Sequence, residues 1–69
     1  SNGEYVSINI FDVNGGKVIE LFNDYRSAGT YSINWNGENE RGLQVSTGVY
    51  LYSIEAGELR QTKKMILLK

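Results

Sequence analysis

The 69-residue sequence predicts a small all-β protein that forms a single domain. β-Branched and aromatic residues are gathered in short runs that Gly, Asn and Ser separate, which is the pattern of successive strands. No window carries apolar residues at positions i, i+3, i+4 and i+7 over the length of a helix. Proline is absent, so glycine and asparagine must provide the turns.

The N-terminal part predicts two strands joined by a tight turn. Residues 5–11 alternate, with Val6, Ile8 and Ile10 on one face of the predicted strand. Residues 12–16 read Asp-Val-Asn-Gly-Gly, which tolerates positive φ, so we expect the chain to reverse there. Residues 17–22 form the returning strand, and residues 23–29 are expected to form a polar loop.

The clearest strand pattern covers residues 30–36. Tyr31, Ile33 and Trp35 share one face, while Ser32 and Asn34 share the other. We expect Trp35 to belong to the core, because a sandwich must bury a large aromatic residue at this spacing.

The C-terminal part predicts two further strands. Residues 36–42 form a long turn, residues 43–45 a brief extended piece, and residues 46–48 a bend. Residues 49–55 carry apolar side chains on both faces, which predicts a central strand. A turn at residues 56–58 leads into a last strand over residues 60–68, polar at its start and apolar at its end.

Five main strands with short connections predict a small antiparallel Ig-like β-sandwich over residues 1–69. Such sandwiches have about seven strands, so we expect this one to lack its first strand. Ser1 and Asn2 are compatible with a cloning remnant. An incomplete sandwich exposes a strand edge, from which we expect self-association by strand addition or exchange.

The composition argues against catalysis and against a cofactor. The sequence has no histidine, the commonest general base, and no cysteine, so thiolate metal sites and disulfides are excluded. Glu38 and Glu40 are paired carboxylates, but they lie on a turn in a domain too small to enclose a sugar chain. We therefore expect no enzyme, no catalytic residue, no cofactor and no metal.

Two ligand-binding alternatives stay open. The turn at residues 36–42 is rich in side-chain oxygens, but its spacing does not match a calcium-binding EF-hand loop. A looser calcium site in this turn is not decided by the sequence. The second alternative is a carbohydrate platform built from aromatic side chains, which would have to be exposed: Tyr31, Trp35, Tyr50 and Tyr52.

Charge is distributed unevenly along the chain. Residues 1–58 carry all eight acidic residues and three basic ones, whereas residues 59–69 carry only bases: Arg60, Lys63, Lys64 and Lys69. These bases either protect a terminal strand from aggregation or form a recognised segment. The net charge of −1 gives no indication of nucleic-acid binding. No apolar run approaches the roughly 20 residues that a membrane-spanning helix needs.

The order of several motifs resembles the type A C-terminal sorting domain of the bacterial type IX secretion system. These motifs are Ile10-Phe11-Asp12-Val13-Asn14-Gly15, Ala28-Gly29-Thr30-Tyr31, Trp35-Asn36-Gly37, Gly48-Val49-Tyr50-Leu51-Tyr52 and the basic and apolar tail at residues 63–69. The sequence is also similar to the Ig-like domain of the flagellar hook-capping protein, which shares the Trp-x-Gly and Gly-Val-Tyr segments. The tail and the Phe-Asp-Val-Asn-Gly segment favour the sorting domain.

The resemblance to sorting domains implies a C-terminal signal that directs a secreted parent protein through the periplasm to the cell surface. Its implied partners are proteins of the outer-membrane secretion machinery. The implied recognised segment is Lys63, Lys64, Met65, Ile66, Leu67, Leu68 and Lys69. The implied framework is Trp35, Gly37, Gly48, Val49 and Tyr50. The alternative is a generic Ig-like structural or protein-interaction domain, as in hook-capping proteins.

Overall fold

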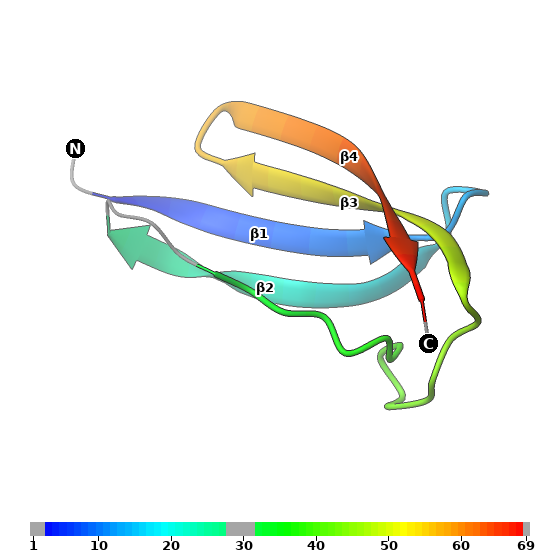
Figure 1. Ribbon diagram of the computed structural model, residues 1–69. Helices are drawn as coiled ribbons and strands as arrows, with labels where there is room; N and C mark the ends of the chain where they lie inside the picture. The colour runs from blue at the N-terminus through cyan, green and yellow to red at the C-terminus, as the bar shows by residue number, and fades with distance from the viewer. Residues whose placement is uncertain (1–2, 28–31, 69) are drawn as a thin grey trace.

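The chain folds into one antiparallel sheet of four strands (Figure 1). The computed structural model describes residues 3–27 and 32–68. The strands are β1 (Gly3–Phe11), β2 (Lys17–Ser27), β3 (Gly48–Ala56) and β4 (Leu59–Leu67), in the spatial order β2-β1-β3-β4. The predicted all-β class is confirmed. Among the described residues, no helix is long and apolar enough to cross a membrane.

The predicted reversal between the first two strands is closed by an aspartate. The Asp12 side chain accepts hydrogen bonds from the backbone N–H groups of Asn14 and Gly16, both at 2.9 Å. Gly15 has a φ of +88°, a conformation that glycine adopts without steric cost. The turn therefore follows from local chemistry that the sequence displays.

Strand β2 is longer than predicted and carries two irregularities. The polar residues 23–27, expected in a loop, instead continue the ladder with β1 as far as the Gly3–Ser27 pair. Backbone pairing with β1 overrides their polarity because these side chains are solvent-exposed or lie at the sheet margin. The register shifts twice, so that Leu21 and Val18 have no partner in β1.

The two faces of the sheet differ at their centre. Strand β3 pairs with β1 on one side and β4 on the other, which confirms the predicted central position. Its Tyr52 and Ile54 share a face with Ile10 and Ile8 of β1, and we call this the inner face. The outer face carries polar groups at its centre: Ser7, Asn9, Ser53 and Thr62.

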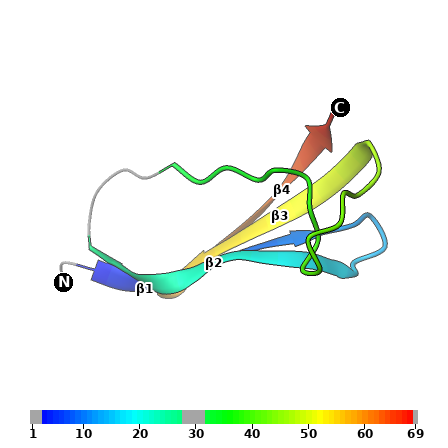
Figure 2. The ribbon, with the colours of Figure 1, turned by 90° about the horizontal axis from the view of Figure 1, so that it is seen from below.

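The second layer of the sandwich is a segment without strand structure. The predicted strand over residues 30–36 is wrong for the described part, because residues 32–36 pair with no strand. They cross the inner face and lead into a turn closed by an isolated bridge between Glu38 and Gln44 (Figure 2). The side-chain alternation is that of a strand, but a ladder also needs a neighbouring backbone, and none lies beside this segment among the described residues.

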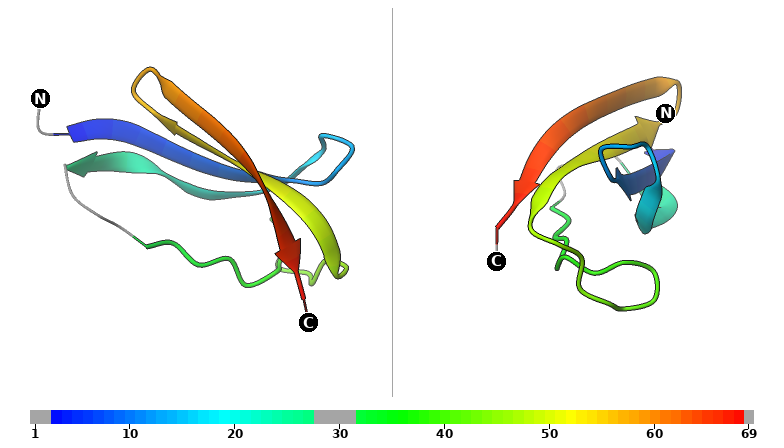
Figure 3. Two further views of the ribbon diagram at one scale, coloured as in Figure 1. Left: turned by 45° about the horizontal axis from the view of Figure 1, so that its top comes forward. Right: turned by 90° about the vertical axis from the view of Figure 1, so that its right-hand side faces the viewer.

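The sheet curves around this segment (Figure 3). The radius of gyration is 12.7 Å, compared with about 11 Å for a compact domain of this length. Among the described apolar residues, only Ile10 and Tyr50 are buried. The inner face is therefore only partly covered.

Candidate interaction surfaces

Trp35 attaches the second layer to the sheet. Its indole meets Tyr50 of β3 edge-on, with ring centroids 5.2 Å apart and planes at 74°. The indole N–H donates a hydrogen bond of 2.9 Å to the Glu38 carbonyl, and the Tyr50 hydroxyl donates one of 2.6 Å to the Ser46 carbonyl. Both polar tips are thus satisfied while the rings pack together. Trp35 is half-buried, so it packs against the sheet without being buried as a core residue.

The glycine after Trp35-Asn36 lies where this turn packs against the last strand. Gly37 is buried and has a φ of +79°. A Cβ there would lie 3.4 Å from both the Leu67 side chain of β4 and the Gln44 side chain. Trp35, Gly37 and Tyr50 thus lie around one packed corner. By contrast, Gly48 and Val49 begin β3, and Val49 points to the outer face with 39% exposure.

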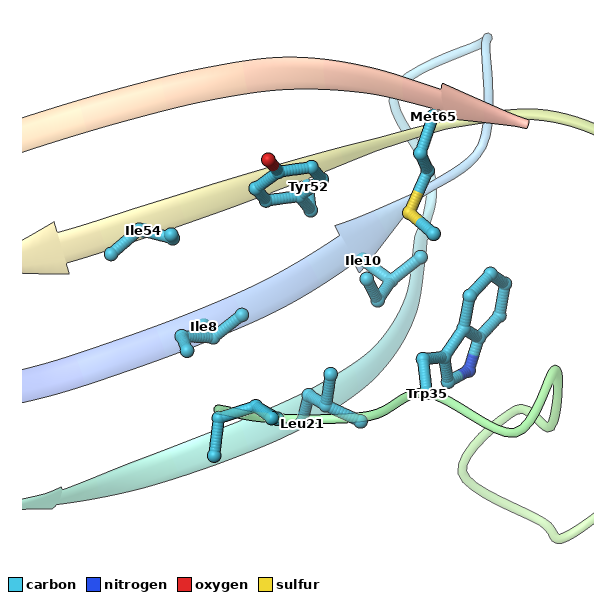
Figure 4. A pocket seen from close by; sticks show the side chains of 8 residues that line it. Ile8, Ile10, Leu21, Trp35, Tyr52, Ile54 and Met65 are labelled. Carbon is cyan, nitrogen blue, oxygen red and sulfur yellow. The ribbon is translucent and has the colours of Figure 1, made fainter. Parts of the chain in front are cut away.

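A groove of about 280 Å³ lies on the inner face, beside the Trp35 segment (Figure 4). Side chains from all four strands and from residues 32–36 line it, and all are apolar or aromatic: Ile8, Ile10, Leu21, Ile33, Trp35, Tyr52, Ile54 and Met65. Leu21 reaches it from a position without a partner in β1, which shows how an irregular strand redirects a side chain. Ile33 remains 37% exposed at its margin.

The aromatic residues proposed as a carbohydrate platform do not form a flat exposed surface. Tyr50 is 8% exposed and Tyr52 lines the groove, while Tyr31 lies outside the described residues. The exposed tyrosines are instead Tyr5 and Tyr25, which face each other across β1 and β2. Their pairing depends on β2 extending past residue 22, so the sequence pattern did not reveal it.

The free edge of β4 is regular and basic. β4 pairs with β3 through nine consecutive residues, without a register shift, and has no partner on its other side among the described residues. Lys63 lies opposite Tyr52 on the inner face, and Lys64 lies opposite Leu51 on the outer face. Neither lysine forms an ion pair within the described part of the chain. Arg60, in contrast, is paired with Glu55 of β3.

The rest of the predicted recognition segment divides between the two faces. Met65 and Leu67 are half-buried on the inner face, whereas Ile66 and Leu68 are 64% and 78% exposed. Lys69 lies outside the described residues. The structure therefore presents Lys63, Lys64, Ile66 and Leu68 to solvent along one edge.

The turn at residues 36–42 uses its amide oxygens to close itself. The Asn39 side chain accepts hydrogen bonds from the backbone N–H groups of Arg41 and Leu43, at 2.9 and 3.1 Å. The Asn36 side chain accepts one from Glu38 at 3.3 Å. Within residues 3–27 and 32–68, no group of three or more carboxylates could hold a metal ion. This arrangement is that of a hydrogen-bonded polar turn.

Comparison with known families identifies the domain. A model of the FlgD Ig-like domain matches residues 1–59, which include β1, β2, β3 and the whole second layer. The chain belongs to the FlgD Ig-like domain family. No curated protein and no solved structure matches it.

Membership of the FlgD Ig-like family corrects the identification made from the sequence. The chain is not assigned to the type IX sorting domains, and the secretion-signal function inferred from them is wrong. The Trp-x-Gly and Gly-Val-Tyr segments lie within the matched residues, but both families share them. The tail at residues 63–69, which favoured the sorting domain, lies beyond the match. Its combination of basic and apolar residues also suits a solvent-exposed edge strand. The secretion machinery and the cell-surface location were inferred from that identification alone.

Proposed function

We propose that this FlgD Ig-like domain is a non-catalytic protein-interaction module, and that the free edge of β4 is its recognition element. The observation that carries this proposal is the regular edge itself, whose lysines lie on both faces and form no ion pair among the described residues. An exposed edge offers backbone N–H and C=O groups to an incoming strand. The absence of histidine and cysteine from the sequence supports a role without chemistry.

The charge of β4 indicates the partner. Residues 59–68 contain no acidic residue, and Lys63 and Lys64 project to opposite faces of the strand. An added strand would place its own side chains beside each of them. The best partner is therefore an extended segment with adjacent acidic residues, one for each face. Opposite charges would also accelerate association and favour one register.

The other edge of the sheet is less suited to this role. Strand β2 has two register shifts, which disturb the spacing of its backbone groups. Its charges are mixed, since Glu20 and Asp24 lie between Lys17 and Arg26. Of the two edges, only β4 therefore offers a partner strand both regularly spaced backbone groups and side-chain charges of one sign.

A pair of designed peptides tests this proposal. The first is a capped, fluorescein-labelled peptide of alternating Thr and Val with a central Glu-Glu, and the second has Lys-Lys in its place. The Glu-Glu peptide should bind, as measured by fluorescence anisotropy. Its affinity should fall as salt is raised from about 50 to 300 mM, because the Debye length shortens. The Lys-Lys peptide should bind at least about tenfold more weakly.

Charge exchange controls for misfolding. The double variant Lys63→Glu, Lys64→Glu should bind the Glu-Glu peptide more weakly and the Lys-Lys peptide more tightly than the wild-type chain does. An unfolded variant would not show this exchange of preference. Lys17→Glu makes the same type of charge change at the other edge, beside Glu40, and should leave the preference unchanged. If the wild-type chain binds both peptides equally, or neither, β4 is not the recognition element.

A further inference from the structure

We propose a second binding site, on the inner face of the sheet, which shares only Lys63 with the β4 edge. The inner-face groove takes an extended segment of another polypeptide, which pairs with residues 32–36 and completes the second layer of the sandwich. The occupant is a strand with alternating apolar side chains and an acidic residue at one margin. Three features of the described residues support this assignment.

The first feature is an unpaired extended backbone. Residues 32–36 keep the side-chain alternation of a strand, since Ile33 and Trp35 line the groove whereas Ser32 and Asn34 are exposed. Within the described residues, their backbone groups form no hydrogen bond with another backbone group. Residues 32, 33, 34 and 36 are exposed, so a second strand could reach the backbone groups of this extended segment and pair with them.

The second feature is the shape and composition of the groove. The strand beside residues 32–36 would lie over β1 and β3, where Ile8, Tyr52 and Ile54 are only half-buried. Figure 4 shows these side chains projecting from the inner face on the far side of the groove from the Trp35 segment. Alternate residues of an added strand point to one face, so every second side chain would reach this apolar surface. Small β-branched side chains fit a cavity of about 280 Å³.

The third feature is a cation at the margin. Lys63 lies opposite Tyr52 on the same face of the sheet and forms no ion pair among the described residues. An acidic residue of the occupant would complement it. A second copy of this chain is a poorer occupant, because its own exposed regular edge is β4, whose lysines would meet Lys63. The charge thus favours a different polypeptide.

Trp35 reports on occupancy, because it is the single tryptophan of the chain and lines the groove. The probe is a capped peptide, Thr-Val-Thr-Val-Thr-Val-Glu, which has alternating apolar residues and a terminal acidic residue. Titration should shift the Trp35 emission to shorter wavelength as water leaves the groove. A peptide of the same composition with its three valines adjacent should bind about tenfold more weakly or not at all. The same probe with N-methylated backbone amides should also fail, because strand pairing requires those N–H groups.

Two lysine substitutions at equally exposed residues separate the groove from general effects. Ile33→Lys, at the groove margin, should lower the affinity for the probe about tenfold or more. Val49→Lys, on the outer face, should leave that affinity unchanged. Circular dichroism shows whether both variants are folded. The test with the N-methylated probe uses the wild-type chain, so misfolding of a variant cannot affect its result. Lys64→Glu should leave this binding unchanged, so a failure of the β4 proposal is recognised independently.

Several outcomes would overturn the groove assignment. These are an unchanged Trp35 emission at saturating probe, equal binding of the alternating and grouped peptides, or equal losses in the two lysine variants. Analytical ultracentrifugation of the chain without peptide could give a further such outcome. If it forms a dimer in which Trp35 emission is already shifted and the probe does not dissociate it, the occupant is a second copy.

Discussion

The indole of Trp35 packs edge-on against Tyr50, and each ring also donates a hydrogen bond to the backbone of the turn region that follows Trp35. The two residues are distant in sequence, and their contact joins the single segment of the second layer to the central strand. The stability of this corner should therefore depend on polar atoms as well as on ring packing.

Tyr50→Phe should lower the free energy of unfolding by about 1 kcal/mol, because it removes the hydrogen bond to the Ser46 carbonyl and keeps the ring. Urea unfolding followed by Trp35 fluorescence measures this change. Tyr25→Phe is the matched control at a tyrosine with 62% exposure, and should change stability by less than about 0.5 kcal/mol. Equal effects at the two positions would contradict the role assigned to the Tyr50 hydroxyl.

Gly37→Ala and Gly42→Ala separate backbone strain from close packing. Both glycines have similar positive φ values, +79° and +78°, so each alanine should cost about 1 kcal/mol for that conformation alone. At Gly42 nothing lies within 4 Å of the new methyl group, whereas at Gly37 it meets Leu67 and Gln44 at 3.4 Å. Since 3.4 Å is ordinary van der Waals contact with flexible side-chain ends, chemical denaturation should show similar losses at the two positions. A much larger loss for Gly37→Ala would mean that Leu67 and Gln44 cannot accommodate the methyl group.

Asn9→Val should stabilise the domain by about 1 kcal/mol. The Asn9 Oδ1 atom is buried and has no hydrogen-bond partner among the described residues, and its Nδ2 makes only a long contact of 3.4 Å with Ser7. Valine removes the unsatisfied group and suits a strand. The urea midpoint should rise with no change in the slope of the transition. A fall in the midpoint would show that Oδ1 is satisfied in solution.

Replacing Lys63 and Lys64 by threonine should increase self-association. Pairing of two β4 edges brings lysines together, and threonine removes the repulsion while keeping the strand propensity. Sedimentation velocity over a concentration series measures the change. High salt should promote association of the wild-type chain, in which it screens the lysines, more than of the variant. No difference between the two proteins would show that the lysines do not protect this edge.

The sequence predicted best where a pattern is local. The alternation in residues 5–11 placed Ile8 and Ile10 on one face of their strand, and the alternation in residues 49–55 placed Tyr52 and Ile54 on one face of theirs. The structure confirms both, and the pairing of β1 with β3 brings the two sets together. The turn at residues 12–16 was also correct, because Asp12 and Gly15 determine it by themselves.

The errors arose where structure depends on a distant neighbour. Residues 23–27 look like a loop but are a strand because β1 extends beside them, and residues 32–36 look like a strand but pair with nothing described. The groove needs side chains from every strand, so no sequence motif reveals it. The identification failed for a related reason, since the shared Trp-x-Gly and Gly-Val-Tyr segments do not separate the two families.

The two irregularities of β2 limit how copies of this domain could assemble. A fibre can grow by head-to-tail strand pairing only if each molecule pairs with one neighbour through one edge and with the next neighbour through its other edge. Here β4 is regular, whereas β2 is interrupted at Leu21 and Val18. Strand pairing between copies would therefore stop after one step, as a closed pair. A sheet with one disturbed edge can leave the other available to a partner without polymerising.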